Sequence, residues 1–427
     1  MRTMPPSLGV RLQVTNTTLV DAPLPDTQGS RLNAVRIALI LMGALIALPA
    51  FVMGAKLNES MGTRNSMIAA VVGGFILSCI AASAAVVGAR SRLSSYQLIL
   101  AAFGYRGGKL VNAVLSVVMV GWFAVVASLF GDAALRAAAG LVTLSASTWV
   151  AIGCVLMTAT TLTGFRALDI LAMLTTPLKV ILLVATVVAS WSLTHGAGLW
   201  AEPDHHELSI PQGISFVVGG VIVGALLTPD LARLATTRTQ AALACFLAFA
   251  VGQPLVLILT GIPARLAGES DLVLIMLRLG LGLPAILIVV LAAWSSNAYN
   301  LYAITLVFRT FSNHAVWKLA AFGGALGAVL ALAGLAQRLT PFLLLLSVAI
   351  PPIAGVYLAS YYIAWVRREA QVRRAWRVDS LLAWLAGVAF SGLGISLSGV
   401  TAVDSLVVAM AAYVALHFSF FQRGKVE

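Results

Sequence analysis

The chain has 427 residues, of which 60% are hydrophobic and only 10% are charged, against about 25% charged residues in an ordinary soluble domain. This composition excludes a soluble globular protein, because so few polar groups cannot cover a surface that faces water, and it indicates a protein whose solvent is the lipid bilayer. The net charge of +12 raises nucleic-acid binding as a possibility, which the distribution of the basic residues argues against.

Apolar segments of about 20 residues recur along the chain, which is the length that an α-helix needs to cross the hydrocarbon core. A membrane β-barrel would instead show alternating segments of about 10 residues, and no other backbone structure spans a bilayer. The sequence therefore predicts an all-α polytopic membrane protein with twelve transmembrane helices. They are expected at 34–54, 66–89, 110–131, 147–165, 168–193, 213–232, 241–263, 281–307, 316–336, 341–364, 380–398 and 401–421.

The predicted helices fall into two successive blocks of five, followed by a final pair. The polar, proline-containing N-terminal segment is expected to be a flexible tail. The predicted organisation is an N-terminal tail at 1–33, a first five-helix repeat at 34–193, a second repeat at 213–364, two C-terminal helices at 380–421 and a short tail at 422–427.

The Lys and Arg residues concentrate on one side of the membrane when the N-terminus is placed inside, as the positive-inside rule requires. We therefore expect a multi-pass protein of the plasma (bacterial inner) membrane, with both termini cytoplasmic and basic loops against anionic lipid. We expect no nucleic-acid partner, and a monomer. The exceptions on the outer side are Lys56, Arg64, Arg136, Arg265, Arg278 and Arg338, while Lys179 lies within a span and is expected to reach toward the inner face.

Two predicted helices carry residues that interrupt a helix. The first contains Gly43, Pro49 and Gly54, and the sixth contains the glycine-rich run 219–224 followed by Pro229. They occupy matching places in the two blocks of five, which is the best sequence indicator of a transporter's binding site, because an unwound turn exposes carbonyls and amides to an ion or a substrate. The alternative is that the glycines only let helices pack closely.

Other classes of membrane protein lack support in the sequence. An intramembrane enzyme needs facing ionisable or nucleophilic groups, but the chain has neither HExxH nor Gly-x-Gly-Asp. A channel needs a repeated selectivity element, and none is visible. We therefore expect a secondary transporter of a small molecule, not an enzyme, a channel or a non-transporting receptor.

Five short motifs, in order and spacing, resemble the nucleobase:cation symporter-1 family, the permeases for cytosine, purines, hydantoins and allantoin. The similarity runs from about residue 40 to 420 and is strongest to the cytosine permeases of that family. The motifs are Gly88-Ala89-Arg90 with Leu93-Ser94-Ser95 and Phe103-Gly104, Val120-Gly121-Trp122-Phe123, Thr228-Pro229-Asp230-Leu231-Ala232-Arg233, Trp294-Ser295-Ser296-Asn297, and Ala349-Ile350-Pro351-Pro352 with Gly355.

The resemblance implies a leucine-transporter-like fold of two inverted five-helix repeats plus two C-terminal helices. It also implies a permease that imports a nucleobase or related heterocycle by alternating access, as a symporter with sodium or protons. Transport without coupling, and transport of a different small solute on the same fold, remain open alternatives.

The resemblance assigns Trp122 to the substrate, because the matching tryptophan of the family stacks on the ring of the base. The alternative is a tryptophan packed between helices. The chain departs from the cytosine permeases at three pocket positions, where Met119, Val221 and Val223 replace a glutamine, a phenylalanine and a serine. These side chains supply no hydrogen bonds, and an unmatched buried polar group costs about 1–3 kcal/mol. Cytosine itself is therefore in doubt, and the hydrogen bonds are expected from the backbone near Gly43 and Gly220 and from Asn297 if it points inward.

The resemblance also implies a sodium site between the first and eighth predicted helices, with sodium as the sole candidate cofactor. Hydroxyls and carbonyls suit this ion, although serines in membrane helices often bond back to the preceding turn instead. The residues at the matching positions are Gly43, Ile46, Ala47, Ala292, Ser295 and Ser296.

Asp230 and Arg233 lie at the inner end of the sixth predicted helix. Charges within a membrane segment are functional candidates. These two stand one helical turn apart, so they can pair with each other or with loop residues. We expect them to form an inner gate or a structural pair, not substrate ligands.

Overall fold

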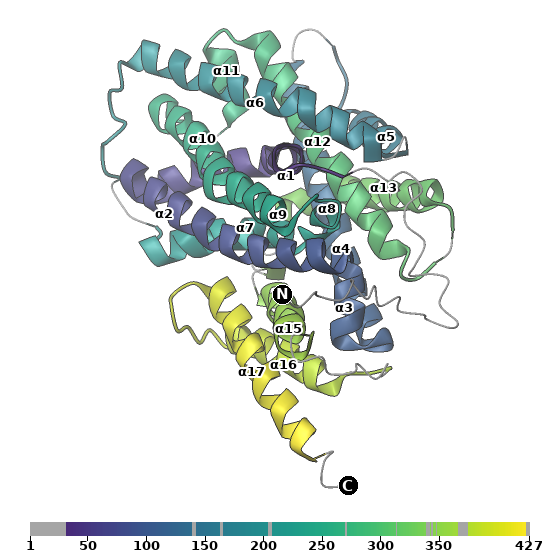
Figure 1. Cartoon of the computed structure of the whole chain (residues 1–427). Helices are drawn as coiled ribbons and strands as arrows, with labels where there is room; N and C mark the ends of the chain where they lie inside the picture. The colour runs from purple at the N-terminus through teal and green to yellow at the C-terminus, as the bar shows by residue number, and fades with distance from the viewer. Residues whose placement is uncertain are drawn as a thin grey trace, which may run out of the picture.

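The computed structural model describes residues 31–138, 142–162, 165–203, 207–269, 271–312, 314–338, 342, 345–346, 348–365 and 375–423. Within these residues the chain is helical throughout (Figure 1), with one isolated parallel bridge between Leu32 and Ala235 in place of any strand. The all-α prediction is therefore confirmed. The predicted tails at 1–33 and 422–427 lie almost wholly outside the described residues.

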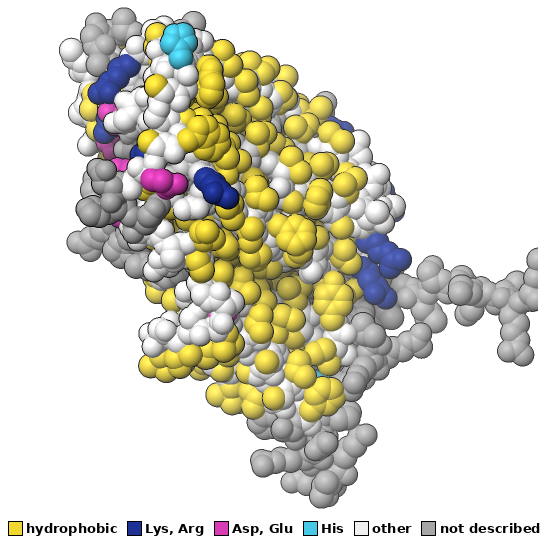
Figure 2. Space-filling view, turned by 90° about the vertical axis from the view of Figure 1, so that its left-hand side faces the viewer, with side chains coloured by type: hydrophobic (Ala, Val, Ile, Leu, Met, Phe, Trp, Pro, Cys, Tyr) yellow, Lys and Arg dark blue, Asp and Glu magenta, His cyan; other side chains and the backbone are white. Residues whose placement is uncertain are grey.

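The helices are long and apolar enough for a membrane protein. In the described part of the chain seven helices can cross a bilayer by length and composition, and four further apolar helices are shorter. Figure 2 shows a broad face of hydrophobic side chains with few charged groups, most of them toward its edges. Such a face is stable only against lipid, so the protein is an integral membrane protein.

Helices lie over each of the predicted apolar segments, and the short helices α3 and α11 add to them in connections that were expected to be loops. The helices are α1 (Ala34–Leu45), α2 (Leu48–Ser91), α3 (Ser95–Phe103), α4 (Tyr105–Ala137), α5 (Ala146–Leu162), α6 (Phe165–Thr194), α7 (Ile210–Leu226), α8 (Pro229–Ala232), α9 (Arg238–Cys245), α10 (Gln253–Ala267), α11 (Leu272–Arg278), α12 (Gly282–Phe308), α13 (Val316–Leu332), α15 (Pro351–Ala359), α16 (Val378–Gly392) and α17 (Thr401–Arg423).

The first predicted interruption is present between α1 and α2. Helix α1 ends at Leu45, and Ile46 and Ala47 leave the helical conformation, with ψ angles of 78° and 160°. Helix α2 then begins with Pro49 in its first turn, where the missing N–H of proline costs nothing. Helix α2 continues through the second predicted span and bends at Gly62, whose φ of 75° favours glycine.

The second interruption lies at the Pro229 end of its predicted place. The run 219–224 stays within helix α7, and the chain makes a short turn at Leu227 and Thr228 before Pro229 opens α8. Gly220 serves close packing, because a Cβ atom there would collide with the side chain of Met53 on α2. Proline has no backbone N–H, so it removes a hydrogen bond from the helix. Glycine only lowers the stability of a helix, and packing against neighbouring helices can compensate for that loss.

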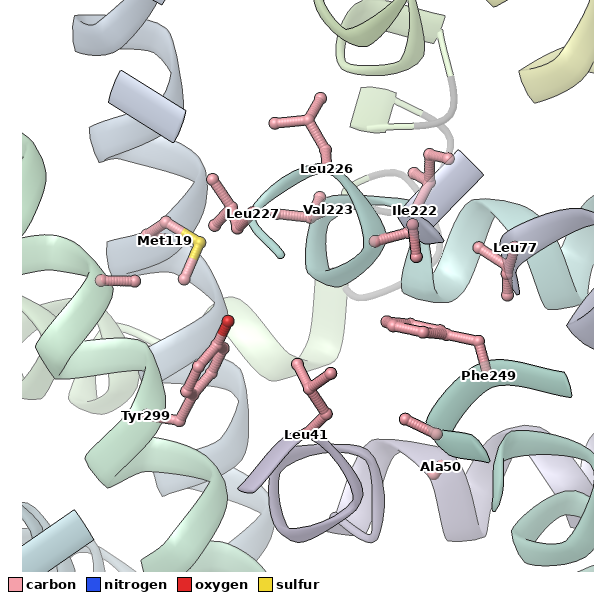
Figure 3. Close-up of a cluster of buried hydrophobic side chains, with 14 of the residues drawn as sticks. Leu41, Ala50, Leu77, Met119, Ile222, Val223, Leu226, Leu227, Phe249 and Tyr299 are labelled. Carbon is pink, nitrogen blue, oxygen red and sulfur yellow. The ribbon is translucent and has the colours of Figure 1, made fainter. Parts of the chain in front are cut away.

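Helix α1 lies in the middle of the bundle, in contact with α6, α9 and α12, and α2 packs along α7 and α10. Figure 3 shows the buried cluster at this centre, where Leu41 of α1, Met119 of α4, Val223 of α7 and Tyr299 of α12 face one another. Helices α15, α16 and α17 pack together to one side (Figure 1). The two helix breaks are thus held inside the larger group of helices.

Candidate functional site

A cavity of about 100 Å³ lies where the two broken helices meet α4 and α12. The residues that line it are mostly small or apolar, which is usual for a ligand site with a few placed polar groups. They are Ala44, Leu45, Ala47, Pro49, Ala50, Met53, Met119, Trp122, Val126, Gly220, Val221, Val223, Gly224, Leu227, Ser296, Tyr299 and Asn300.

Trp122 stands in the wall of this cavity on helix α4 and is partly buried. The ring of Phe342 packs edge-on against it, with centroids 5.6 Å apart and planes at 72°. An edge-on neighbour fixes the orientation of the indole plane. Phe342 does not itself stack parallel to the indole ring. The predicted substrate residue therefore has the position and the support that stacking on a planar ring requires.

Four of the other predicted substrate residues also line the cavity, namely Met119, Gly220, Val221 and Val223. Helices α4 and α7 therefore supply the apolar wall that the sequence indicated. Gly43 is not part of the lining, and its carbonyl is engaged elsewhere. The last turn of α1 contributes Ala44 and Leu45 in its place, and the unwound segment contributes Ala47.

Three polar side chains of the cavity come from a single face of helix α12. Ser296, Tyr299 and Asn300 stand three and four residues apart, which places them on one side of a helix. Ser296 and Tyr299 are each 5% exposed, and the Tyr299 hydroxyl is buried without a hydrogen-bond partner. Figure 3 shows this hydroxyl directed toward Met119. An unmatched buried hydroxyl is costly, so the cavity offers a ligand a ready hydrogen-bonding group.

The prediction that Asn297 points into the cavity is wrong. Asn297 is fully buried on another face of α12, where its amide donates to the carbonyl of Phe123 at 3.0 Å. Its Oδ1 atom accepts a 3.2 Å hydrogen bond from Asn300. Asn297 therefore joins α12 to α4 and positions Asn300, which is the asparagine of the cavity. The spacing from Ser296 would have indicated Asn300, since 296 and 300 are one turn apart.

A second polar site lies behind the cavity wall, around Lys179 of helix α6. This side chain is fully buried, and its Nζ atom donates to the Gly43 carbonyl at 2.7 Å and the Ile46 carbonyl at 3.2 Å. It also donates to the Ser295 hydroxyl at 2.7 Å. The prediction that Lys179 reaches toward the inner face is therefore wrong, because the end of α1 offers the ammonium group acceptors inside the protein.

The residues assigned to sodium divide between these two sites. Gly43, Ile46 and Ser295 surround the Lys179 ammonium, and Ser295 also bonds back to the Leu291 carbonyl at 2.9 Å. By contrast, Ala47 and Ser296 line the cavity, and Ala292 is buried in the core. Three of the expected oxygen ligands are thus already engaged by a cationic side chain, so they do not fit a sodium ion at the same place.

Asp230 and Arg233 lie in α8 and the turn after it, but their carboxylate and guanidinium groups do not pair. Asp230 Oδ1 accepts from the amide of Ser95 at 2.7 Å, at the start of α3, while Oδ2 is buried without a partner. The Arg233 Nε donates to the Asp230 carbonyl at 3.2 Å. A carboxylate at a helix N-terminus is favourable, so Asp230 fixes α3 against α8.

A membrane protein with a cavity at two interrupted helices has the features of the class of secondary transporters. The sequence profile of the permeases for cytosine/purines, uracil, thiamine and allantoin matches residues 25–414. This chain belongs to that family and is not an enzyme.

Relatives and solved structures agree with this assignment. The cytosine permease of Escherichia coli (strain K12) is 27% identical over 401 residues, which cover 92% of this chain and 93% of that protein. Mhp1, a nucleobase-cation-symport-1 family transporter in a closed conformation with bromovinylhydantoin bound, has the same fold, with a TM-score of 0.81 and 18% identity over 91% of this chain and 92% of that one. Its inward-facing conformation gives 0.78 and 17%, over 92% of both chains.

Proposed function

We propose that the protein is a secondary active transporter that imports a nucleobase or a related small heterocycle by alternating access, coupled to a cation. The observation that carries this proposal is the cavity in which Trp122 stands between the breaks of α1–α2 and α7–α8. Stacking on an aromatic side chain recognises any planar ring and contributes about 1–3 kcal/mol per base. The permeases of this family act on cytosine, purines, uracil, thiamine and allantoin, which contain small heterocycles of this kind.

The chemistry of the lining supports a ring with few polar groups. The wall of Met119, Val221 and Val223 offers no side-chain hydrogen bonds, so these must come from Ser296, Tyr299 and Asn300. All three lie on α12, and a ligand in this cavity therefore directs its polar edge toward α12. Cytosine carries donors and acceptors on several edges, and this one-sided arrangement favours a less polar heterocycle or a different small solute of similar size.

The architecture proposed for this function is the one that the sequence predicts. It comprises twelve transmembrane helices, with two inverted five-helix repeats and two C-terminal helices, in a monomer whose basic loops contact anionic lipid. The termini are cytoplasmic, which the distribution of Lys and Arg supports. In alternating access, one repeat moves against the other around the site, and helix breaks at the site permit that motion.

A thermal-shift screen of the purified protein tests the substrate class. Cytosine, uracil, purines, hydantoins, allantoin and pyrimidine precursors of vitamins are compared, because a ligand of the folded state at a hundredfold excess over Kd stabilises it by about 2.7 kcal/mol. We expect one heterocycle to raise the melting temperature and Trp122→Ala to remove that shift. The same heterocycle should accumulate in proteoliposomes. A protein that responds to none of these rings would contradict the proposed substrate class and leave the fold unaffected.

A further inference from the structure

The surroundings of Lys179 match the hydrogen-bonding capacity of an ammonium group. An ammonium has three donors and no acceptor, and its Nζ atom meets three oxygens at 2.7, 3.2 and 2.7 Å. The Ser295 hydroxyl can accept from Lys179 because its own proton is directed to a backbone carbonyl, that of Gly43 or Leu291. Each donor of the buried group is therefore satisfied, as burial requires.

The two carbonyls are available because helix α1 ends beside them. The amide of Ala47 would reach the Gly43 carbonyl in a continuous helix, but it bonds to Leu45 at 2.9 Å. The amide of Ala50, which would reach Ile46, bonds to Ala47 at 2.9 Å. The last carbonyls of a helix carry its negative dipole end, which favours a cation. The break thus creates a cation position, and Lys179 fills it.

Lys179 also joins three separate helices at this position. Its backbone belongs to α6, and its ammonium contacts α1 and α12. Three residues earlier on α6, Thr176 donates to the Leu39 carbonyl of α1 at 3.1 Å. A mobile ion could leave this point, whereas the Lys179 side chain stays between α1 and α12 because it is covalently part of α6.

We propose that Lys179 is the resident cation of this position, so that the protein binds its substrate without a sodium ion between α1 and α12. The part that concerns substrate rests on the proposed function. A second cation among the same three oxygens would meet the full repulsion of the ammonium group in a buried, low-dielectric place. Sodium at this position is therefore not the coupling cation, and an imposed sodium gradient is expected to leave uptake unchanged.

The first test needs no organic substrate. The melting temperature of the purified protein is measured in sodium chloride and in choline chloride at equal ionic strength. We expect the wild type to melt within about 1 °C in both salts. Lys179→Ala leaves the oxygens of Gly43, Ile46 and Ser295 around an open space, so its melting temperature should be lower in choline and rise by about 3 °C or more in sodium.

Two control variants separate the missing charge from lost packing. Lys179→Met fills the space without a charge and is expected to melt at the same temperature in both salts. Thr176→Val removes the neighbouring bond to α1 and should likewise show no difference between the salts. A wild type stabilised by sodium by 3 °C or more would overturn the proposal, even where Lys179→Ala does not fold. A Lys179→Ala protein that melts at the same temperature in both salts would overturn it too.

The outcome is independent of the proposed substrate class. If no heterocycle binds but the salts act as expected, the substrate class fails and the role of Lys179 stands. If a heterocycle binds to the wild type only in sodium, the substrate class stands and the role of Lys179 fails.

Discussion

Ser295 and Ser296 are neighbours on helix α12, yet they belong to two sites of opposite character. Ser295 accepts from Lys179 and lies 2.9 Å from the Gly43 carbonyl, in a site whose polar groups are all matched by the chain itself. Ser296 faces a cavity beside Tyr299, whose hydroxyl has no partner. The chain itself completes the polar site at Ser295, whereas the cavity at Ser296 leaves a hydroxyl available to a ligand.

The difference follows from the rotation of about 100° between successive residues of a helix. One face of α12 turns toward α1 and α6, where a helix end supplies carbonyls and α6 supplies the amine. The next face turns toward α4 and α7, where the apolar side chains of Met119 and Val223 leave room. Substitutions on the two faces should therefore affect different properties.

Lys179→Met is expected to have the largest effect on transport. It leaves the Gly43 and Ile46 carbonyls and the Ser295 hydroxyl without their shared donor, at about 1–3 kcal/mol for each unmatched group. We expect uptake in proteoliposomes to fall by about 100-fold or more, with a lower melting temperature. If the variant retained more than half of the wild-type uptake, the hydrogen bonds of Lys179 would not be required for transport.

Trp122→Ala should weaken the binding of the transported heterocycle by about 5–150-fold, the equivalent of losing one stacked ring. Trp122→Phe keeps an aromatic face and should lose much less. Isothermal titration of both variants with the heterocycle found in the screen measures the two losses. Equal losses in the two variants would mean that Trp122 packs against its neighbours and does not stack on the substrate.

The pair Ser296→Ala and Ser295→Ala compares the two sites most closely. Ser296→Ala removes one hydrogen bond to the ligand, so its affinity should fall by about 2–12-fold, with an unchanged melting temperature in the absence of ligand. Ser295→Ala should instead lower the melting temperature, because it removes an acceptor of Lys179. Reversed results for the two serines would place the ligand on the wrong face of α12.

The smallest effect is expected at the exposed ion pair of Lys56 and Glu207, which belongs to neither site. A hydrogen bond of 3.0 Å from Lys56, together with its charge, holds the pKa of Glu207 below the ordinary value of 4.5. A lowered carboxylate pKa contributes stability above that ordinary value and loses it as the pH falls through the folded-state pKa. Glu207→Gln should therefore melt slightly below the wild type at pH 7, and the difference should disappear as the pH falls through the folded-state pKa. A difference that persists at low pH would exclude this electrostatic origin.

The sequence was sufficient for the positions of the apolar helices, for the existence of both interruptions and for part of the cavity wall. Length and hydropathy determine which segments enter the bilayer. Trp122, Met119, Gly220, Val221 and Val223 lie at the cavity as the family resemblance implied.

Three features could not be predicted from the sequence because they depend on how the helices are rotated and packed. Helix α12 is apolar on nearly all sides, so its pattern does not show which face is turned inward, and the sequence motif favours Asn297 over Asn300. The run 219–224 stays helical, and within it Gly220 packs closely against Met53 of α2. In the sequence Lys179 is a lone lysine in an apolar segment, because its partners on α1 and α12 are distant along the chain.

Titration of the wild type with its heterocycle, in sodium chloride and in choline chloride at equal ionic strength, tests the central claim most directly. The claim is that the ligand site is open while the cation position is filled by the chain. It predicts dissociation constants that agree within about twofold between the two salts, a difference of less than about 0.5 kcal/mol. Tightening by tenfold or more in sodium would contradict it, because sodium would then take part in forming the site.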